Sequence, residues 1–149
     1  MKFGYLIKNT LLLTLIPASK RNQKKMGEQK RILLVENSRT ALAGLTLQLE
    51  AAQYIVEGVR LGAEAILKVQ EKPYFAIIMD IFMPQMNGYE AAKHIRDLGI
   101  QTPIFALTGS QDPRDKQTCL ESGMNAFLPK SEHLTELFEE LNKLLKQEQ

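Results

Sequence analysis

The chain has 149 residues, an ordinary share of charged residues and a net charge of +2, which fits one soluble globular domain with a buried core. The charge is uneven, because residues 1–30 carry seven Lys or Arg and one Glu, whereas residues 31–149 carry twelve basic residues and sixteen acids. An acidic body argues against nucleic acid as the domain's partner. The single cysteine, Cys119, excludes an intrachain disulfide and fits a reducing cytoplasm.

Residues 1–29 form a basic leader that differs in composition from the rest of the chain. Its apolar run, residues 11–16, is shorter than the roughly 20 residues that a membrane span needs, so membrane association is not expected. Three explanations stay open: an over-extended start with Met26 as the natural first residue, a flexible or amphipathic leader, and a signal peptide. We expect residues 30–149 to form one domain with no output domain, because the chain stops where its last predicted helix stops.

From residue 31 onward, short apolar runs alternate with stretches of helical periodicity. The apolar runs predict strands over residues 31–35, 54–59, 75–79, 104–108 and 126–128. The periodic stretches predict helices that begin after Ser38, at Gly62, after Asn87, at Asp112–Pro113 and after Ser131, the last one ending near Gln147. Ser38, Asn87 and Ser131 are expected to cap their helices. This alternation predicts an α/β fold, a doubly wound five-stranded parallel sheet with helices on both faces.

Polar residues follow four of the five predicted strands or end them. Glu36 and Asn37 follow the first, Asp80 follows the third, Thr108 ends the fourth and Lys130 follows the fifth. Because the carboxyl ends of parallel strands share one edge of a sheet, these residues are expected to meet in one crevice. A lone carboxylate there, at the tip of a buried strand, suits a nucleophile, a metal ligand or both.

Four segments around these residues form a specific pattern when taken in order: Leu33–Asn37, Met79–Pro84, Ala106–Gly109 and Phe127–Lys130. Over about residues 30–147 the chain resembles the receiver domain of response regulators. Two further segments are similar to receivers of hybrid sensor kinases, Thr102–Ile104 and Gly123–Met124. The resemblance implies the flavodoxin-like (βα)5 fold, and it implies that Asp80 accepts a phosphoryl group from a phosphohistidine.

The resemblance also implies a metal site and a phosphoryl site. Mg²⁺ would be held by Glu36, Asn37, Asp80 and the backbone carbonyl of Phe82, since hard cations choose oxygen ligands. Lys130 would pair with a phosphoryl oxygen as a point charge.

Three further roles follow from the same resemblance. Thr108 would donate its hydroxyl to the bound phosphoryl group, and Gly109 would leave space for that group. Phe127 stands where the family has an aromatic residue that switches between exposed and buried states.

The chain departs from the family pattern in three places. Asn37 replaces the second acid, so either Mg²⁺ binds more weakly than at a full acid pair, or the chain is a degenerate receiver that binds proteins as a phosphorylation-independent adaptor. Phe82 at the mouth of the site could hinder the water that hydrolyses an acyl phosphate, which predicts slow self-dephosphorylation. Ser131 stands where the family commonly has a proline after a cis peptide bond, and both isomers stay open here.

The expected partners are proteins. The phosphoryl donor would be a sensor histidine kinase or a histidine phosphotransfer protein. A downstream target would bind the face made by the helix opened at Asp112–Pro113, the strand over residues 126–128 and the last helix. A homodimer through the last helices stays open.

No independent enzyme activity is expected beyond self-phosphotransfer and autodephosphorylation on Asp80. A hydrolase with an aspartyl nucleophile of the haloacid-dehalogenase type would want a second Asp at position 82, where this chain has Phe82. A flavodoxin would want a Ser-, Thr- and Gly-rich loop after the first strand, where this chain has residues 36–39.

Overall fold

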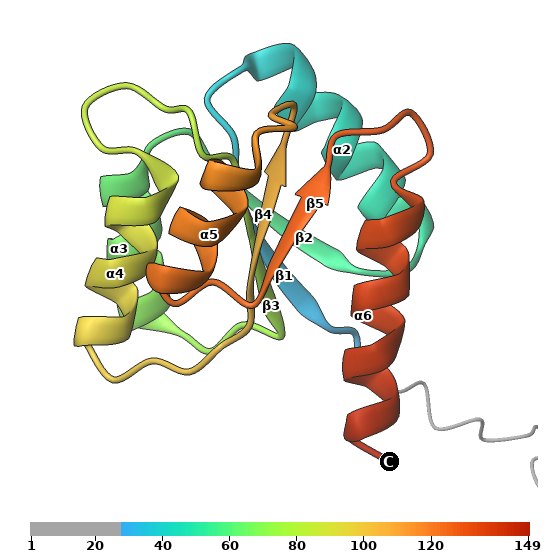
Figure 1. The fold of residues 1–149 in the computed structure, drawn as a ribbon. Coiled ribbons are helices and arrows are strands. Elements are labelled where there is room, and N and C mark those ends of the chain that lie inside the picture. Colours follow the sequence, from blue (N-terminus) through green and yellow to red (C-terminus); the bar gives the residue numbers. More distant parts are fainter. Residues whose placement is uncertain (1–27) are drawn as a thin grey trace, which may run out of the picture.

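The computed structural model describes residues 28–149, so the expectations for residues 1–27 of the leader lie outside the described part. Within it, five parallel strands form one sheet in the order β2–β1–β3–β4–β5 (Figure 1). The strands are β1 (Arg31–Val35), β2 (Ile55–Val59), β3 (Ala76–Met79), β4 (Ile104–Thr108) and β5 (Ala126–Pro129). The helices are α2 (Arg39–Ala51), α3 (Gly62–Glu71), α4 (Gly88–Asp97), α5 (Pro113–Glu121) and α6 (Thr135–Gln147). The predicted doubly wound α/β fold is confirmed.

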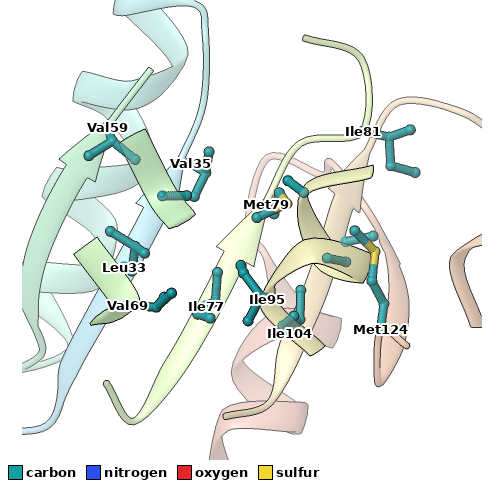
Figure 2. Packing of buried hydrophobic residues seen from close by; sticks show 14 of the residues in the cluster. Leu33, Val35, Val59, Val69, Ile77, Met79, Ile81, Ile95, Ile104 and Met124 are labelled. Atoms are coloured by element: carbon teal, nitrogen blue, oxygen red, sulfur yellow. The ribbon is translucent and has the colours of Figure 1, made fainter. Parts of the chain in front are cut away.

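The sheet separates two hydrophobic layers. Helices α2 and α6 cover one face, where Ile32 and Leu34 pack with residues such as Leu49. Helices α3, α4 and α5 cover the other face, where Leu33 packs in the cluster that contains Ile95 (Figure 2). Because strand residues alternate between these layers, both sets are buried, and the strands read as continuous apolar runs. Each fully buried Leu or Ile contributes about 1.5–3 kcal/mol relative to an exposed one.

Two of the three predicted helix caps are present. The Ser38 hydroxyl accepts from the amide of Ala41 at 3.3 Å. The Asn87 side chain accepts from the amide of Glu90 at 2.9 Å, and the Glu90 carboxylate accepts from the Asn87 amide at 3.0 Å, which completes a capping box. Both caps fix the helix that follows a loop at the carboxyl edge of the sheet.

The prediction that Ser131 caps the last helix is wrong. Helix α6 begins at Thr135, and its N-cap is Leu134, which lies in the left-handed region at φ 50°. Residues 131–134 form a turn in which the Leu134 amide donates to the Ser131 carbonyl at 3.4 Å. The Leu134 side chain is 2% exposed in the layer under α6, so its burial outweighs the local capping chemistry of Ser131. The Lys130–Ser131 bond is trans, because residues 28–149 contain no cis peptide.

At the amino edge of the sheet, Arg96 of α4 joins two loops, one before β4 and one before β5. Its guanidinium donates to the carbonyls of Gly123, Ile100 and Thr102 at 2.8–2.9 Å and to the Asn125 side chain at 2.8 Å. Gly123 has φ +93°, and a methyl group there would meet the Arg96 side chain at 2.8 Å. The segments before β4 and β5 are therefore tied to the end of α4. No helix within residues 28–149 is long and apolar enough to cross a membrane.

Candidate functional site

At the carboxyl edge of the sheet, the predicted site residues lie at the ends of neighbouring strands. Val35 pairs with Met79 and Met79 pairs with Ala106, so Glu36 and Asp80 leave β1 and β3 side by side. The Asp80 amide donates to the Val35 carbonyl at 3.0 Å, which continues the sheet ladder one step into the loop. On the other side, the Lys130 amide donates to the Thr108 carbonyl at 2.8 Å.

A single ammonium bridges two carboxylates at this edge. Lys130 Nζ lies 2.7 Å from Glu36 Oε2 and 3.4 Å from Asp80 Oδ2. The side chains of Glu36 and Asp80 are 4% and 11% exposed, whereas that of Lys130 is 31% exposed. The structure therefore brings together three residues that are far apart in the sequence, and it leaves one more negative than positive charge among them.

The protonation of Asp80 reflects this environment. Burial raises the pKa of the Asp80 carboxyl, against the attraction of the Lys130 ammonium, and the repulsion from the Glu36 carboxylate adds to the increase. The net direction is upward, so the folded protein disfavours the charged form of Asp80. A cation or a positive end of a dipole beside Asp80 would relieve that cost.

Asn37 turns toward the loop after β2. Its side-chain amide donates to the Arg60 carbonyl at 3.3 Å, and the Arg60 Nε donates back to the Asn37 carbonyl at 3.0 Å. The Arg60 amide is in turn held by the Glu64 carboxylate at 3.1 Å. No sequence pattern indicates this pairing, because a lone Arg after an edge strand has no distinguishing spacing.

The loop after β3 holds Asp80 against the start of α4. The Gly88 amide donates to the Ile81 carbonyl at 2.8 Å, and a methyl group on Gly88 would overlap the Asp80 carbonyl oxygen. Gly88 therefore permits an approach that no other residue would allow. The Asn-Gly sequence predicts a turn here, but it does not reveal this contact. Phe82 lies at the rim, with its amide 3.4 Å from Asp80 Oδ1 and its side chain 62% exposed.

The three other predicted residues lie on β4, on β5 and in the loop after β4. Thr108 is fully buried, and its hydroxyl accepts from the Ser110 amide at 3.1 Å. A methyl group on Gly109 would meet nothing within 4 Å, so open space lies beside this residue. Phe127 pairs with Ala106 in the sheet and packs, partly buried, against the layer under α3, α4 and α5.

The donor chemistry at this edge fits a hard divalent cation. Glu36 and Asp80 supply two carboxylates beside the Lys130 ammonium. Asn37 follows Glu36 directly and Phe82 comes two residues after Asp80, so a side-chain amide oxygen and a backbone carbonyl are the further oxygen donors in these two loops. Within residues 28–149, no group of three or more His, Cys, Asp or Glu side chains is placed to hold a metal. These oxygen donors are therefore of the kind that a hard divalent cation binds, but only two of them carry a negative charge.

The comparison with protein families decides the classification. Residues 32–142 match the model of the response regulator receiver domain. This chain belongs to the receiver-domain family. The family and the fold predicted from the sequence are both confirmed. Receiver domains of two-component systems accept phosphoryl groups, and at the edge described above this receiver carries Glu36 and Asp80.

Individual relatives agree with this assignment. The chain is 33% identical over 126 residues to two-component system protein A of Emericella nidulans, covering 80% of this chain and 18% of that protein. It is also 33% identical over 126 residues to the autoinducer 2 sensor kinase/phosphatase LuxQ of Vibrio vulnificus, covering 84% of this chain and 15% of that protein. The chain thus spans less than a fifth of the length of these two relatives.

A solved structure gives the same result in three dimensions. The receiver domain of a sensor histidine kinase from Pseudomonas aeruginosa PAO1 superposes with a TM-score of 0.73 and 32% identity, covering 80% of this receiver and 99% of that domain. That domain was determined with a magnesium ion coordinated in its active site cleft.

Proposed function

We propose that this receiver accepts a phosphoryl group on Asp80 from a phosphohistidine and thereby changes its binding to a partner protein. The observation that carries the proposal is the position of Lys130 Nζ, 3.4 Å from Asp80 Oδ2 and 2.7 Å from Glu36 Oε2. A partly buried carboxylate whose pKa is raised by burial, and which faces a fixed ammonium, suits an acceptor of a highly charged group. The donor would be a sensor histidine kinase or a histidine phosphotransfer protein.

The transfer needs positioning and charge compensation more than covalent help from the protein. An Asp80 carboxylate oxygen forms the new bond to phosphorus while the phosphorus–nitrogen bond of the phosphohistidine breaks. The electron pair of that bond returns to the imidazole nitrogen, and the product on Asp80 is an acyl phosphate. The Lys130 ammonium pairs with a phosphoryl oxygen, and the Thr108 hydroxyl donates to another.

Mg²⁺ is the proposed cofactor. Glu36, Asn37, Asp80 and the Phe82 carbonyl would hold it, and a bound Mg²⁺ supplies positive charge beside the phosphoryl oxygens. We expect its affinity to be lower than at a site with a second acid, because the Asn37 amide carries no charge and donates to the Arg60 carbonyl. The residues that would bind Mg²⁺ stay the same, and only the strength of binding would fall.

The output surface would be the face formed by α5, β5 and α6. Movement of Thr108 toward the phosphoryl group, accompanied by Phe127 on β5, would rearrange this face and shift the population of the form that a target binds. Thr108 and Phe127 lie on neighbouring strands that share the pair Ala106–Phe127, which supports a joint rearrangement.

The test uses acetyl phosphate or phosphoramidate with Mg²⁺, followed by measurement of the intact mass. The expected result is a gain of one phosphoryl group, which is lost on treatment with base and absent in Asp80→Asn. Asp97→Asn, the same change at an exposed residue at the end of α4, should leave the gain intact. Phosphorylation that persists in Asp80→Asn would refute Asp80 as the acceptor.

A second candidate is an adaptor that binds its partner without phosphorylation. The observation that favours it is the hydrogen bond from the Asn37 side chain to Arg60, in place of a charged metal ligand. This candidate predicts no mass gain with either donor, and it predicts equal binding of a target by Asp80→Asn and by the unsubstituted protein.

A further inference from the structure

The loop after β4 controls the hydroxyl of Thr108. Thr108 is fully buried, and its Oγ1 accepts the amide hydrogen of Ser110 at 3.1 Å. A hydroxyl oxygen that accepts from its own loop keeps the orientation which that loop imposes. The Ser110 amide therefore restrains the position of the Thr108 hydroxyl oxygen.

Ser110 is itself held by the start of α5. Its hydroxyl donates to the Asp115 carboxylate, and the same hydroxyl oxygen accepts from the amide of Asp112 at 3.2 Å. A hydrogen bond to a charged acceptor is stronger than one between neutral groups. The loop over residues 109–112 is thus fastened at its centre to the first turn of α5.

Asp115 is connected in turn to α4. The Tyr89 hydroxyl lies 3.1 Å from the Asp115 backbone carbonyl and 3.3 Å from its Oδ1, and can donate its single proton to either. Burial and the Asp115 charge raise the pKa of Tyr89 to about 12, so this hydroxyl remains a donor at neutral pH. A continuous chain of contacts therefore runs from Tyr89 on α4, through Asp115 and Ser110, to Thr108.

We propose that Asp115 is a positioning residue of this receiver, which restrains Thr108 through Ser110 in the unphosphorylated protein. The inference rests on the proposed function, in which Thr108 moves to donate to a phosphoryl group on Asp80. Such a movement either carries the Ser110 amide with Thr108, which strains the contact between Ser110 and Asp115, or breaks the hydrogen bond between the Ser110 amide, which Asp115 holds in place, and Thr108. The restraint shifts the equilibrium between the arrangements of Thr108 before and after this movement, because the hydrogen bonds that form the restraint are complete only before it.

The test compares the affinity for beryllium trifluoride, an anion that mimics a phosphoryl group on a carboxylate, at saturating Mg²⁺. Asp115→Asn replaces the charged hydrogen bond of the resting arrangement by a weaker neutral one, which should tighten binding about three- to tenfold. Ser110→Ala should behave alike and keeps every charge, which separates the restraint from the effect of an acid in the first turn of α5. Ser110→Thr, which retains a hydroxyl, should bind like the unsubstituted protein.

A second measurement needs no ligand. In the free protein, exchange of the Ser110 amide hydrogen with solvent should be faster in Asp115→Asn, in Ser110→Ala and in Tyr89→Phe than in Asp97→Asn, an exposed control with the same chemical change as Asp115→Asn. Unchanged exchange, or weaker binding of beryllium trifluoride by Asp115→Asn, overturns the proposal. Failure of the unsubstituted protein to bind beryllium trifluoride would count against the proposed function, while the exchange measurement would still decide the restraint.

Discussion

The Lys130 ammonium lies closer to Glu36, at 2.7 Å, than to Asp80, at 3.4 Å. Glu36 is also the more deeply buried of the two acids, with 4% of its side chain exposed. A buried carboxylate without a partner is costly, so Lys130→Met should lower the free energy of unfolding by about 1–3 kcal/mol at pH 7. Urea unfolding measures this change, and Lys116→Met on the exposed side of α5 is the control. Adding Glu36→Gln should restore part of the loss, because the orphaned charge is then removed.

The pH range of that contribution follows from the pKa of Lys130. Burial lowers it, but the contacts with Glu36 and Asp80 outweigh burial, so the pKa of Lys130 is raised above its usual value. A raised lysine pKa means that the stabilisation is complete below the ordinary lysine pKa and is lost only as the pH rises through the folded value. The difference between Lys130→Met and the unsubstituted protein should therefore persist through neutral pH and decline under alkaline conditions.

Glu57 on β2 should support stability in the opposite pH range. Burial opposes its ionisation, but hydrogen bonds from Tyr74 at 2.8 Å, Lys68 at 3.0 Å and Lys72 at 3.1 Å lower the pKa of Glu57 to about 2. A lowered pKa gives stability that is present above the unfolded value near 4.5 and is lost as the pH falls toward 2. Glu57→Gln should thus cost about 1–3 kcal/mol at pH 7 and almost nothing near pH 2. Chemical denaturation across this range measures the trend, and a cost independent of pH would contradict it.

Asn37→Asp should increase the affinity for Mg²⁺. The substitution adds a negative charge to a site that holds the carboxylates of Glu36 and Asp80, and a gain of about tenfold corresponds to about 1.4 kcal/mol. Isothermal titration calorimetry measures it, with Asn142→Asp on α6 as the control for net charge. Equal affinities would show that the amide at position 37 does not limit metal binding.

Phe82→Ala should shorten the lifetime of the phosphorylated protein. The Phe82 side chain is 62% exposed, two residues after Asp80, where it can impede the approach of water to an acyl phosphate. Opening that approach should speed hydrolysis about three- to tenfold, on the order of 1 kcal/mol in the barrier. Decay of the phosphorylated mass over time gives the rate, and Phe82→Leu, which keeps a bulky apolar side chain, should stay near the original value.

Gly88→Ala should damage the site through the backbone. The added methyl group would overlap the Asp80 carbonyl oxygen, so α4 or the loop after β3 must shift, at a cost of about 1–3 kcal/mol. Thermal unfolding should show a lower midpoint and the yield of phosphorylated protein should fall, whereas Gly44→Ala on α2, where a methyl group meets nothing within 4 Å, should not lower stability. An unaltered phosphorylation yield in Gly88→Ala would contradict the importance of this contact.

Most of the fold could be predicted because local and tertiary preferences agree. The apolar runs ending at Val35, Met79 and Thr108 are strands in the structure, and the side chains of Ser38 and Asn87 cap helices as their chemistry predicts. At Ser131 the two preferences disagree. Burial of Leu134 sets the start of α6, and no pattern around Ser131 signals it.

The sequence could predict the position of those site residues that lie directly at the end of a strand. Glu36, Asp80 and Lys130 meet because their strands are neighbours or share an edge, which follows from the parallel sheet. The direction of a side chain within a loop does not follow from the sheet. The pairing of Asn37 with Arg60 and the contact of Ser110 with Asp115 depend on loop geometry, so the sequence alone did not indicate them.

The four hydrogen bonds of Arg96 set how α5 and β5 can move. Because Arg96 fastens the segments leading into β4 and β5 to α4 at the amino edge, while the site lies at the carboxyl edge, these elements are anchored at one end. A helix or strand that is fixed at one end and displaced at the other rotates about its fixed end. A small displacement of the loop beside Asp80 would therefore tilt α5 about its fixed end and would not need to shift the helix along the sheet.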